Sequence, residues 1–290
     1  MTKISKVIGR QVFDSRGNPT VEAEIFSDDG HQALAIAPSG ASTGTHEAFE
    51  LRDKENKNYL GKSVFKAIEN INGAISKHLN NFDVLNQKKI DQALIDLDGT
   101  EQKSKLGANS ILAVSIAASK LGAKCKNVSL FNYLGGPSAN QLPLPLMNII
   151  NGGMHANNSL RIQEFMIRPE NPKTFSESIR MCFLVIQNLK NILNSSNLST
   201  TVGDEGGFAP ALNNNEDAIE LILQAIEQSG FKPGEDISIC LDVASNELFK
   251  EGKYSIKSAS FDNFENTIDY YLGLINKYPI KSIEDPNNNL

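Results

Sequence analysis

Residues 237–243 read Ile-Ser-Ile-Cys-Leu-Asp-Val, an almost continuously apolar segment with one acid, Asp242, near its carboxyl end. Continuous apolar runs are typical of strands that are buried on both faces, as in parallel sheets. A second apolar strand is predicted at 280–283 and is followed directly by Glu284. In β/α barrels the reactive groups gather at the carboxyl ends of the strands. We therefore expect these two acids to meet at one mouth of a barrel.

A glycine-rich loop supplies a third acid. Residues 203–207 read Gly-Asp-Glu-Gly-Gly and place Glu205 between glycines, which permit close approach of backbone or ligand. Several carboxylates at one mouth repel one another unless a cation neutralises them, and Mg²⁺ suits such oxygen ligands. The alternatives are a tight acidic turn for the loop, and solvated carboxylates or helix caps for the strand-end acids.

A histidine lies near a further predicted strand end. His155 follows Asn151-Gly152-Gly153, nine residues before Glu164, in a chain with four histidines. A lone histidine is usually structural, but one in a glycine loop after a barrel strand is also a candidate for binding or proton transfer. Both interpretations stay open at this point.

The first half of the chain shows strands followed by helices. Strands are predicted at 4–12, 20–26 and 32–37, joined by turn residues into an antiparallel meander. Apolar spacing predicts helices at 64–79 and 90–97, and one at 110–124 capped by Asn109. The small-residue run 38–44 is either a linker or a ligand-binding lid. We expect an α+β domain over residues 1–134.

In the second half, predicted strands alternate with helices. Thr174 and Glu177 form a capping box, Asn215 is predicted to cap a second helix, and a third helix is predicted at 264–277. This alternation predicts parallel β/α units in a barrel domain over residues 135–290.

Composition narrows the class of protein. The chain has 290 residues, 40% of them hydrophobic and 21% charged, with a net charge of −6. These values favour a globular protein and argue against a nucleic-acid partner, which usually demands a basic face. No segment approaches the ~20 apolar residues of a membrane span, and no signal peptide is recognisable, so we expect a cytoplasmic protein. Cys125, Cys182 and Cys240 are expected to pack as small apolar residues.

Taken together, these motifs resemble the enolase family. The matching segments occur in the family's order and are 14–22 (Asp-Ser-Arg-Gly-Asn-Pro-Thr-Val-Glu), 38–44, 105–109, 151–156, 163–167, 203–207, 241–242 and 282–286. The resemblance implies reversible Mg²⁺-dependent dehydration of 2-phospho-D-glycerate to phosphoenolpyruvate, with two Mg²⁺ ions per active site. It also implies a homodimer with Arg16 and Glu22 near domain and subunit contacts, and a surface-associated or secreted fraction of the protein.

The resemblance implies a role for each candidate residue. Asp242 and Glu284 are similar to two of three carboxylates that hold the first Mg²⁺, and Ser42 is similar to a ligand of the second. Glu205 resembles the general acid that protonates the departing hydroxyl, with Glu164 beside it. Two further residues resemble substrate contacts, namely His155 and Gln163.

No residue of this chain matches the family's base lysine, third metal carboxylate or phosphate-gripping segment. We therefore expect the front two-thirds of an enolase, with a complete N-terminal domain and an incomplete barrel, and little or no dehydratase activity from these 290 residues alone. Two alternatives are a catalytically dead enolase fragment with a binding or scaffold role, and a metal-dependent enzyme of the wider barrel superfamily that acts on another acid.

Overall fold

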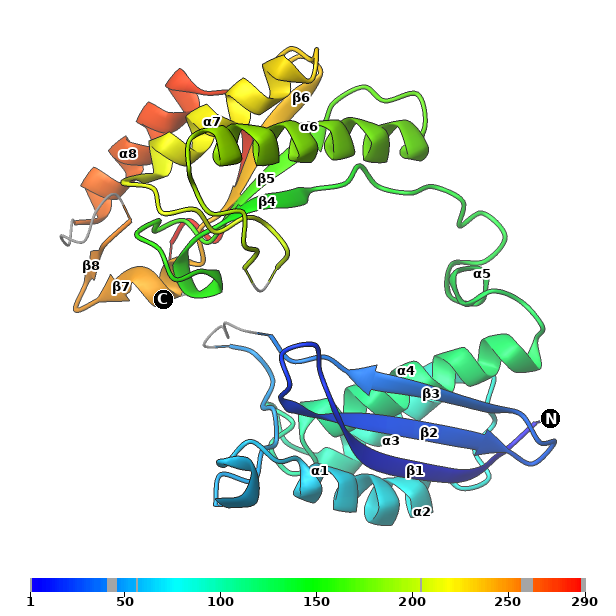
Figure 1. Cartoon of the computed structure of the whole chain (residues 1–290). Coiled ribbons are helices and arrows are strands. Elements are labelled where there is room, and N and C mark those ends of the chain that lie inside the picture. Colours follow the sequence, from blue (N-terminus) through cyan, green and yellow to red (C-terminus); the bar gives the residue numbers. More distant parts are fainter. Residues whose placement is uncertain (1, 41–45, 56, 204, 257–262, 288–290) are drawn as a thin grey trace. The chain divides into compact units, whose positions relative to one another are not determined.

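The computed structural model describes residues 2–40, 46–55, 57–203, 205–256 and 263–287 (Figure 1). The chain divides into two compact units, the first reaching Gln141 and the second beginning at Leu142. The domain bounds 1–134 and 135–290 stay a prediction. Within the described ranges, no helix has the length and apolar character that would let it cross a membrane.

The first unit contains the predicted meander. Strands β1 (Ile4–Phe13), β2 (Pro19–Ser27) and β3 (Gln32–Ala37) pair antiparallel in the order β1-β2-β3. Alternate residues of β3 are buried, as expected for a sheet with one face on the core. Helix α4 (Ala108–Cys125) packs against β2 and β3 with a row of buried small residues (Figure 1). The predicted meander is confirmed.

The remaining helices of this unit follow the predicted order. The segment 65–79 is continuously helical but divides into α1 (Phe65–Asn70), a π-helical turn η2 (Ile71–Ile75) and α2 (Ser76–Leu79). The other elements are η1 (Lys57–Tyr59), α3 (Gln87–Asp98) and α5 (Leu130–Gly135). The predicted cap of α4 is wrong. Its N-cap is Gly107, and the Asn109 side chain instead accepts a hydrogen bond from the Leu51 amide and donates one to the Leu51 carbonyl.

The second unit is built on a four-stranded sheet. Its strands are β4 (Met147–Asn151), β5 (Glu164–Pro169), β6 (Ile237–Asp242) and β9 (Ile280–Glu284), in that order. The prediction of parallel units throughout is wrong, because β4–β5 and β5–β6 pair antiparallel and only β6–β9 is parallel. Among the described residues this sheet does not close, so the barrel is incomplete.

Three helices accompany this sheet, namely α6 (Phe175–Ser195), α7 (Asn215–Gln228) and α8 (Phe264–Lys277) (Figure 1). Their apolar faces and alternate residues of the strands, such as Ile237, Ile239 and Leu241, form one buried core. Shorter elements complete the unit: η3 (Gly153–His155), η4 (Ser245–Leu248), β7 (Phe249–Lys250) and β8 (Lys253–Tyr254). The Thr174 hydroxyl accepts a hydrogen bond from the Glu177 amide and caps α6 as predicted.

The cap of α7 lies one residue before the predicted one. Asn214 accepts a hydrogen bond from the Asp217 amide. Asn215 is buried and joins three segments instead. Its Oδ1 accepts from the amides of Arg161 and Ile162, and its Nδ2 donates to the Ile256 carbonyl.

This difference predicts unequal costs for two adjacent substitutions. Asn214→Ala removes one cap and should cost about 1 kcal/mol. Asn215→Ala leaves several buried backbone groups unpaired and should cost about 3 kcal/mol. Urea denaturation of the two variants measures both losses. Equal losses, or a larger loss for Asn214→Ala, would show that Asn215 does not hold these segments together.

Candidate active site

The site begins with a row of polar residues that crosses the second sheet. Asn151, Glu164, Asp242 and Glu284 are consecutive Cα partners on β4, β5, β6 and β9. Partners opposite one another on neighbouring strands direct their side chains to the same face. Three carboxylates therefore lie side by side, and we call these three residues the acid row.

Burial and mutual repulsion act on the acid row. Burial, followed by the charges of Asp242, Glu205 and Glu284, raises the pKa of Glu164 to about 7. Burial also raises the pKa of Asp242 against the opposing hydrogen bond from the Ala244 amide, and the charges of Glu284 and Asp285 add to the rise. Carboxylates that resist ionisation in this way favour either a bound proton or a cation.

His155 connects the acid row with the glycine-rich loop. It ends the short helix η3, and its side chain is only 4% exposed. Its Nδ1 lies 3.6 Å from the Glu164 carboxylate, and its Nε2 lies 3.7 Å from the carboxylate of Glu205, which is 48% exposed. The ligand atoms of these three residues lie within 4.8 Å of one another. The structure thus places an imidazole between a buried acid and an exposed one.

The glycines of the loop are explained by close packing. A Cβ at Gly203 would clash with the His155 carbonyl and the Asn151 side chain, and one at Gly207 would clash with Asn151 and the backbone of β4. Gly206 has φ +83°, which L-residues rarely adopt. The loop is held to β4 by hydrogen bonds from the Phe208 amide to the Ile149 carbonyl and from the Asn151 amide to the Phe208 carbonyl. This packing fixes the backbone of the loop at Gly203 and at Gly207.

Several buried polar atoms in this region have no hydrogen-bond partner within the described residues. They include His155 Nδ1, Gln163 Oε1, Asn151 Nδ2 and Ser245 Oγ. Such atoms usually find a partner, so a group of them beside a row of acids indicates a place where a ligand binds. The backbone of Gln163 is paired, since its amide donates a hydrogen bond to the Asp242 backbone carbonyl and its carbonyl accepts one from the Gly152 amide.

The structure brings together five of the seven predicted site residues: His155, Glu164, Glu205, Asp242 and Glu284. Gln163 is buried next to Glu164 in the sequence, and no described contact joins its side chain to the other five. Ser42 lies outside the described residues. Their individual roles remain predictions.

Two polar residues were given no role from the sequence. Asn151 occupies the β4 position of the row, and Ser245 follows Asp242 by three residues. The signal for Asn151 was its place at the end of an apolar strand, directly before two glycines.

Two family models and a known protein match this chain. The family model described as the enolase N-terminal domain matches residues 4–134, and that of the enolase C-terminal TIM barrel domain matches residues 139–289. An enolase of Pelagibacter ubique (strain HTCC1062) is 60% identical over 286 residues, which are 99% of this chain and 68% of that protein. The two matched regions together cover nearly the whole chain.

The raised pKa of Glu164 predicts how stability depends on pH. Between the ordinary value of 4.5 and about 7, the folded chain holds a proton on Glu164 that the unfolded chain releases. This contribution to stability is complete below pH ~4.5 and is lost as the pH rises to ~7, a change on the order of 2–3 kcal/mol. Glu164→Gln should flatten this slope, as measured by urea denaturation in chelator at several pH values.

Glu170→Gln is the matched control, because Glu170 directly follows the last residue of β5, whereas Glu164 is its first. Burial opposes ionisation of Glu170, but the hydrogen bonds and the charge of Arg168 outweigh it, with a contribution from Lys281, and lower its pKa. Glu170 therefore stays ionised over this range, and its replacement should leave the slope intact. An unchanged slope in Glu164→Gln would contradict the protonated state assigned to Glu164.

Proposed function

Because the chain belongs to the enolase family, a family of glycolytic lyases, we propose that its acid row acts in the reversible dehydration of 2-phospho-D-glycerate to phosphoenolpyruvate. The observation that supports this most is the adjacency of Glu164, Asp242 and Glu284 across three strands, with His155 and Glu205 beside them. A neutral substrate would gain little binding free energy from three adjacent carboxylates. A cation bound together with an anionic substrate would gain more.

The residues fit Mg²⁺. Asp242 and Glu284 offer hard oxygen ligands on neighbouring strands, and burial, which raises the pKa of Asp242, opposes an ionised form that a cation would favour. We propose that these two residues hold the ion. Bound there, Mg²⁺ would supply fixed positive charge for the negative charge that develops when a proton is removed next to the substrate carboxylate. From the family resemblance we also propose a second ion, with Ser42 as a ligand.

Glu205 is the proposed general acid. Its carboxylate is half exposed at a loop whose backbone is fixed by glycine packing, so it can reach a substrate hydroxyl while its position stays defined. Hydroxide is a poor leaving group, and a positioned acid is typically worth ~10²–10⁴-fold in rate. Glu164, with a pKa near 7, can hold a proton close to neutral pH and donate a hydrogen bond to the departing group or to a water.

His155 and Gln163 are the proposed substrate contacts. Each has a buried polar atom without a described hydrogen-bond partner, namely His155 Nδ1, which lies 3.6 Å from the Glu164 carboxylate, and Gln163 Oε1. A phospho-acid offers oxygens that can accept from the imidazole, and its hydroxyl can donate to the amide oxygen. Asn151 Nδ2 is a further buried donor without a hydrogen-bond partner, and Asn151 is the partner of Glu164 on the neighbouring strand β4.

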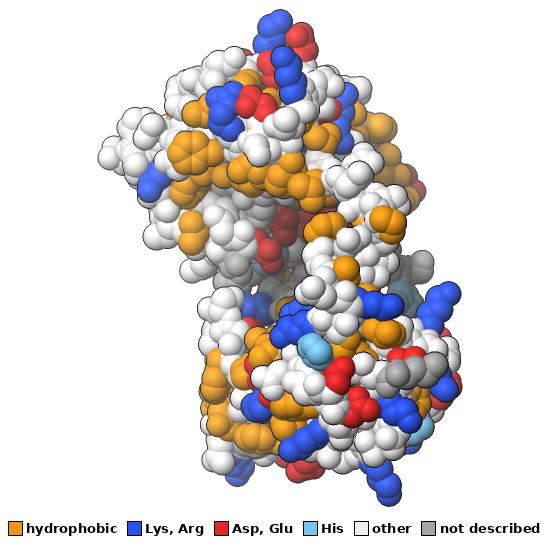
Figure 2. All heavy atoms as spheres, turned by 90° about the vertical axis from the view of Figure 1, so that its right-hand side faces the viewer, with side chains coloured by type: hydrophobic (Ala, Val, Ile, Leu, Met, Phe, Trp, Pro, Cys, Tyr) orange, Lys and Arg blue, Asp and Glu red, His pale blue; other side chains and the backbone are white. Residues whose placement is uncertain are grey.

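By the same resemblance we propose a cytoplasmic homodimer with a small-molecule substrate and no nucleic-acid partner. On the face drawn in Figure 2, basic side chains lie among acidic and hydrophobic ones rather than in one stripe, which supports the last point for that face. From the same resemblance we propose that these 290 residues do not include the family's base lysine. The second candidate function is accordingly a binding or scaffold role without turnover.

Turnover by this chain is therefore expected to be very low. In excess Mg²⁺ with 2-phospho-D-glycerate, we expect phosphoenolpyruvate to form at least ~10³-fold more slowly than with the Pelagibacter enolase as the positive control, because the base is unmatched. Ultraviolet absorbance of the product measures this. Robust turnover by the purified 290-residue chain would contradict the expectation.

Binding of Mg²⁺ tests the site separately from turnover. Calorimetry should detect Mg²⁺ binding that Asp242→Asn weakens at least ~10-fold, since a direct ligand is lost. Glu235→Gln is the matched control, because Glu235 precedes the same strand and forms an exposed ion pair with Lys232. A stable, monodisperse chain without any Mg²⁺ binding would contradict the proposed metal site and favour the scaffold role.

A further inference from the structure

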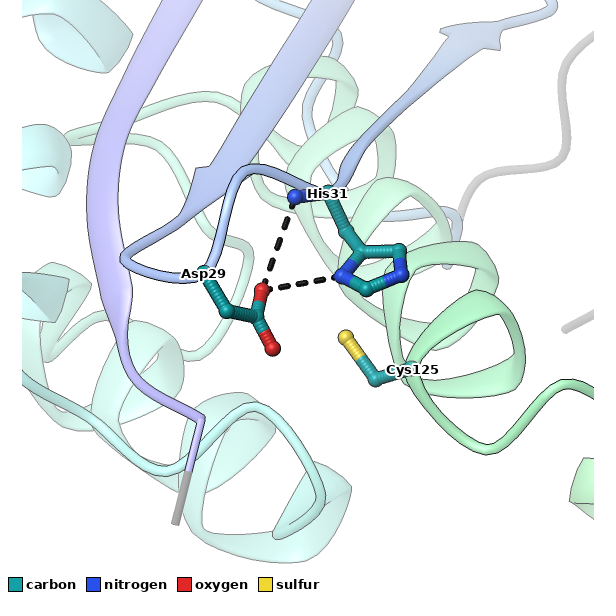
Figure 3. Close-up of side chains that lie close together, drawn as sticks. All are labelled: Asp29, His31 and Cys125. Carbon is teal, nitrogen blue, oxygen red and sulfur yellow. Dashed lines mark hydrogen bonds and ion pairs between the residues drawn. The ribbon is translucent and has the colours of Figure 1, made fainter.

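The first unit contains a second group of side chains suited to a metal ion. Asp29 and His31 lie in the turn between β2 and β3, and Cys125 is the last residue of α4 (Figure 3). The carboxylate, imidazole and thiol offer ligand atoms that lie within 4.8 Å of one another. None of these residues belongs to the acid row.

Hydroxyl groups hold the Asp29 carboxylate in place. Its Oδ2 accepts a hydrogen bond from the Thr2 hydroxyl at 2.9 Å, and its Oδ1 accepts one from the Ser27 hydroxyl at 2.5 Å. The same Oδ1 lies 2.9 Å from His31 Nδ1, the contact drawn in Figure 3. Metal ligands are commonly oriented by such outer hydrogen bonds, which reduces the ordering that binding requires.

A simpler interpretation explains only part of this group. An exposed Asp29–His31 ion pair could stabilise the turn, and such pairs contribute about 0–1 kcal/mol to folding stability. The pair does not involve Cys125, a half-buried thiol beside it that packs against the core of this unit. A cation at this place would compensate the carboxylate charge and favour the thiolate.

The kinds of ligand select the kind of ion. Mg²⁺ and Ca²⁺ prefer oxygen, whereas one sulfur, one nitrogen and one oxygen suit a borderline divalent ion. Zn²⁺ commonly takes three protein ligands and a water in a tetrahedral site. The side chains of His31 and Asp29 are 48% and 41% exposed, so an ion can enter from solvent.

We propose that Asp29, His31 and Cys125 form a binding site for a borderline divalent transition-metal ion, Zn²⁺ in particular, in the first unit. The fourth position is left to water or to an external ligand. The His31–Asp29 contact opens as the imidazole turns to the ion, the Asp29 carboxylate stays held by Thr2 and Ser27, and the thiol proton is released to solvent.

Co²⁺ provides a spectroscopic probe of this site in the whole chain. With excess Mg²⁺ present to occupy the acid row, a Co²⁺ titration should produce a thiolate-to-metal charge-transfer band that saturates at about one equivalent and is abolished by Zn²⁺. Cys125→Ser should eliminate the band, and His31→Asn should weaken binding at least ~10-fold. Two matched controls, Cys240→Ala and His78→Asn, should leave it unchanged.

Alkylation of the unsubstituted chain gives a measurement that needs no variant. Zn²⁺ should slow the modification of Cys125 by iodoacetamide at least ~10-fold, as quantified by mass spectrometry of the peptide. The absence of the charge-transfer band, its persistence in Cys125→Ser, its loss in Cys240→Ala, or unchanged alkylation in Zn²⁺ would each overturn the proposal. The Asp29–His31 ion pair would then serve only to stabilise the turn.

Discussion

The register between β5, β6 and β9 is the constraint on which the site depends. Ile237, Ile239 and Leu241 belong to the core beneath the helices, so Asp242 and its partners occupy the opposite face. A slip of β6 by one residue would move these apolar side chains out of the core and send the carboxylate into it. The position of the acids is therefore maintained by hydrophobic packing on the other face of the sheet.

This register has an electrostatic cost. Two unit charges ~5 Å apart repel by about 3 kcal/mol at an effective dielectric constant of about 20. Within the acid row, a proton on Glu164 removes part of this repulsion, since the pKa of Glu164 is raised to about 7. A cation held by Asp242 and Glu284 would compensate the charge of the other two carboxylates.

The sequence predicted the location of most elements and the antiparallel meander of the first unit, but not the direction of the strands in the second unit. A continuous apolar run reports burial on both faces, which the antiparallel β5–β6 pair also achieves. The antiparallel direction of β4 and β5 could have been inferred from their short connection at 152–163, which contains only the three-residue helix η3 and not the crossover that parallel strands require. Two predictions of helix caps were wrong for local reasons. The N-cap of α4, Gly107, has no side chain from which a cap could be recognised. Asn214 and Asn215 have identical side chains, so only their tertiary contacts distinguish them. The acids were found because strand ends carry chemistry in barrels, whereas their pKa values depend on burial that no sequence motif reports.

The hairpin from β4 to β5 has a consequence for the order of folding. Its 23 residues (147–169) contain Asn151, His155, Gln163 and Glu164, so half of the site is assembled by contacts that are close in sequence. Such contacts require little loop closure and form fast. Asp242 and Glu284 arrive through pairings that span far longer loops. We expect the uncharged framework of the site to form early, and the repulsion between its carboxylates to arise only when the last strands dock.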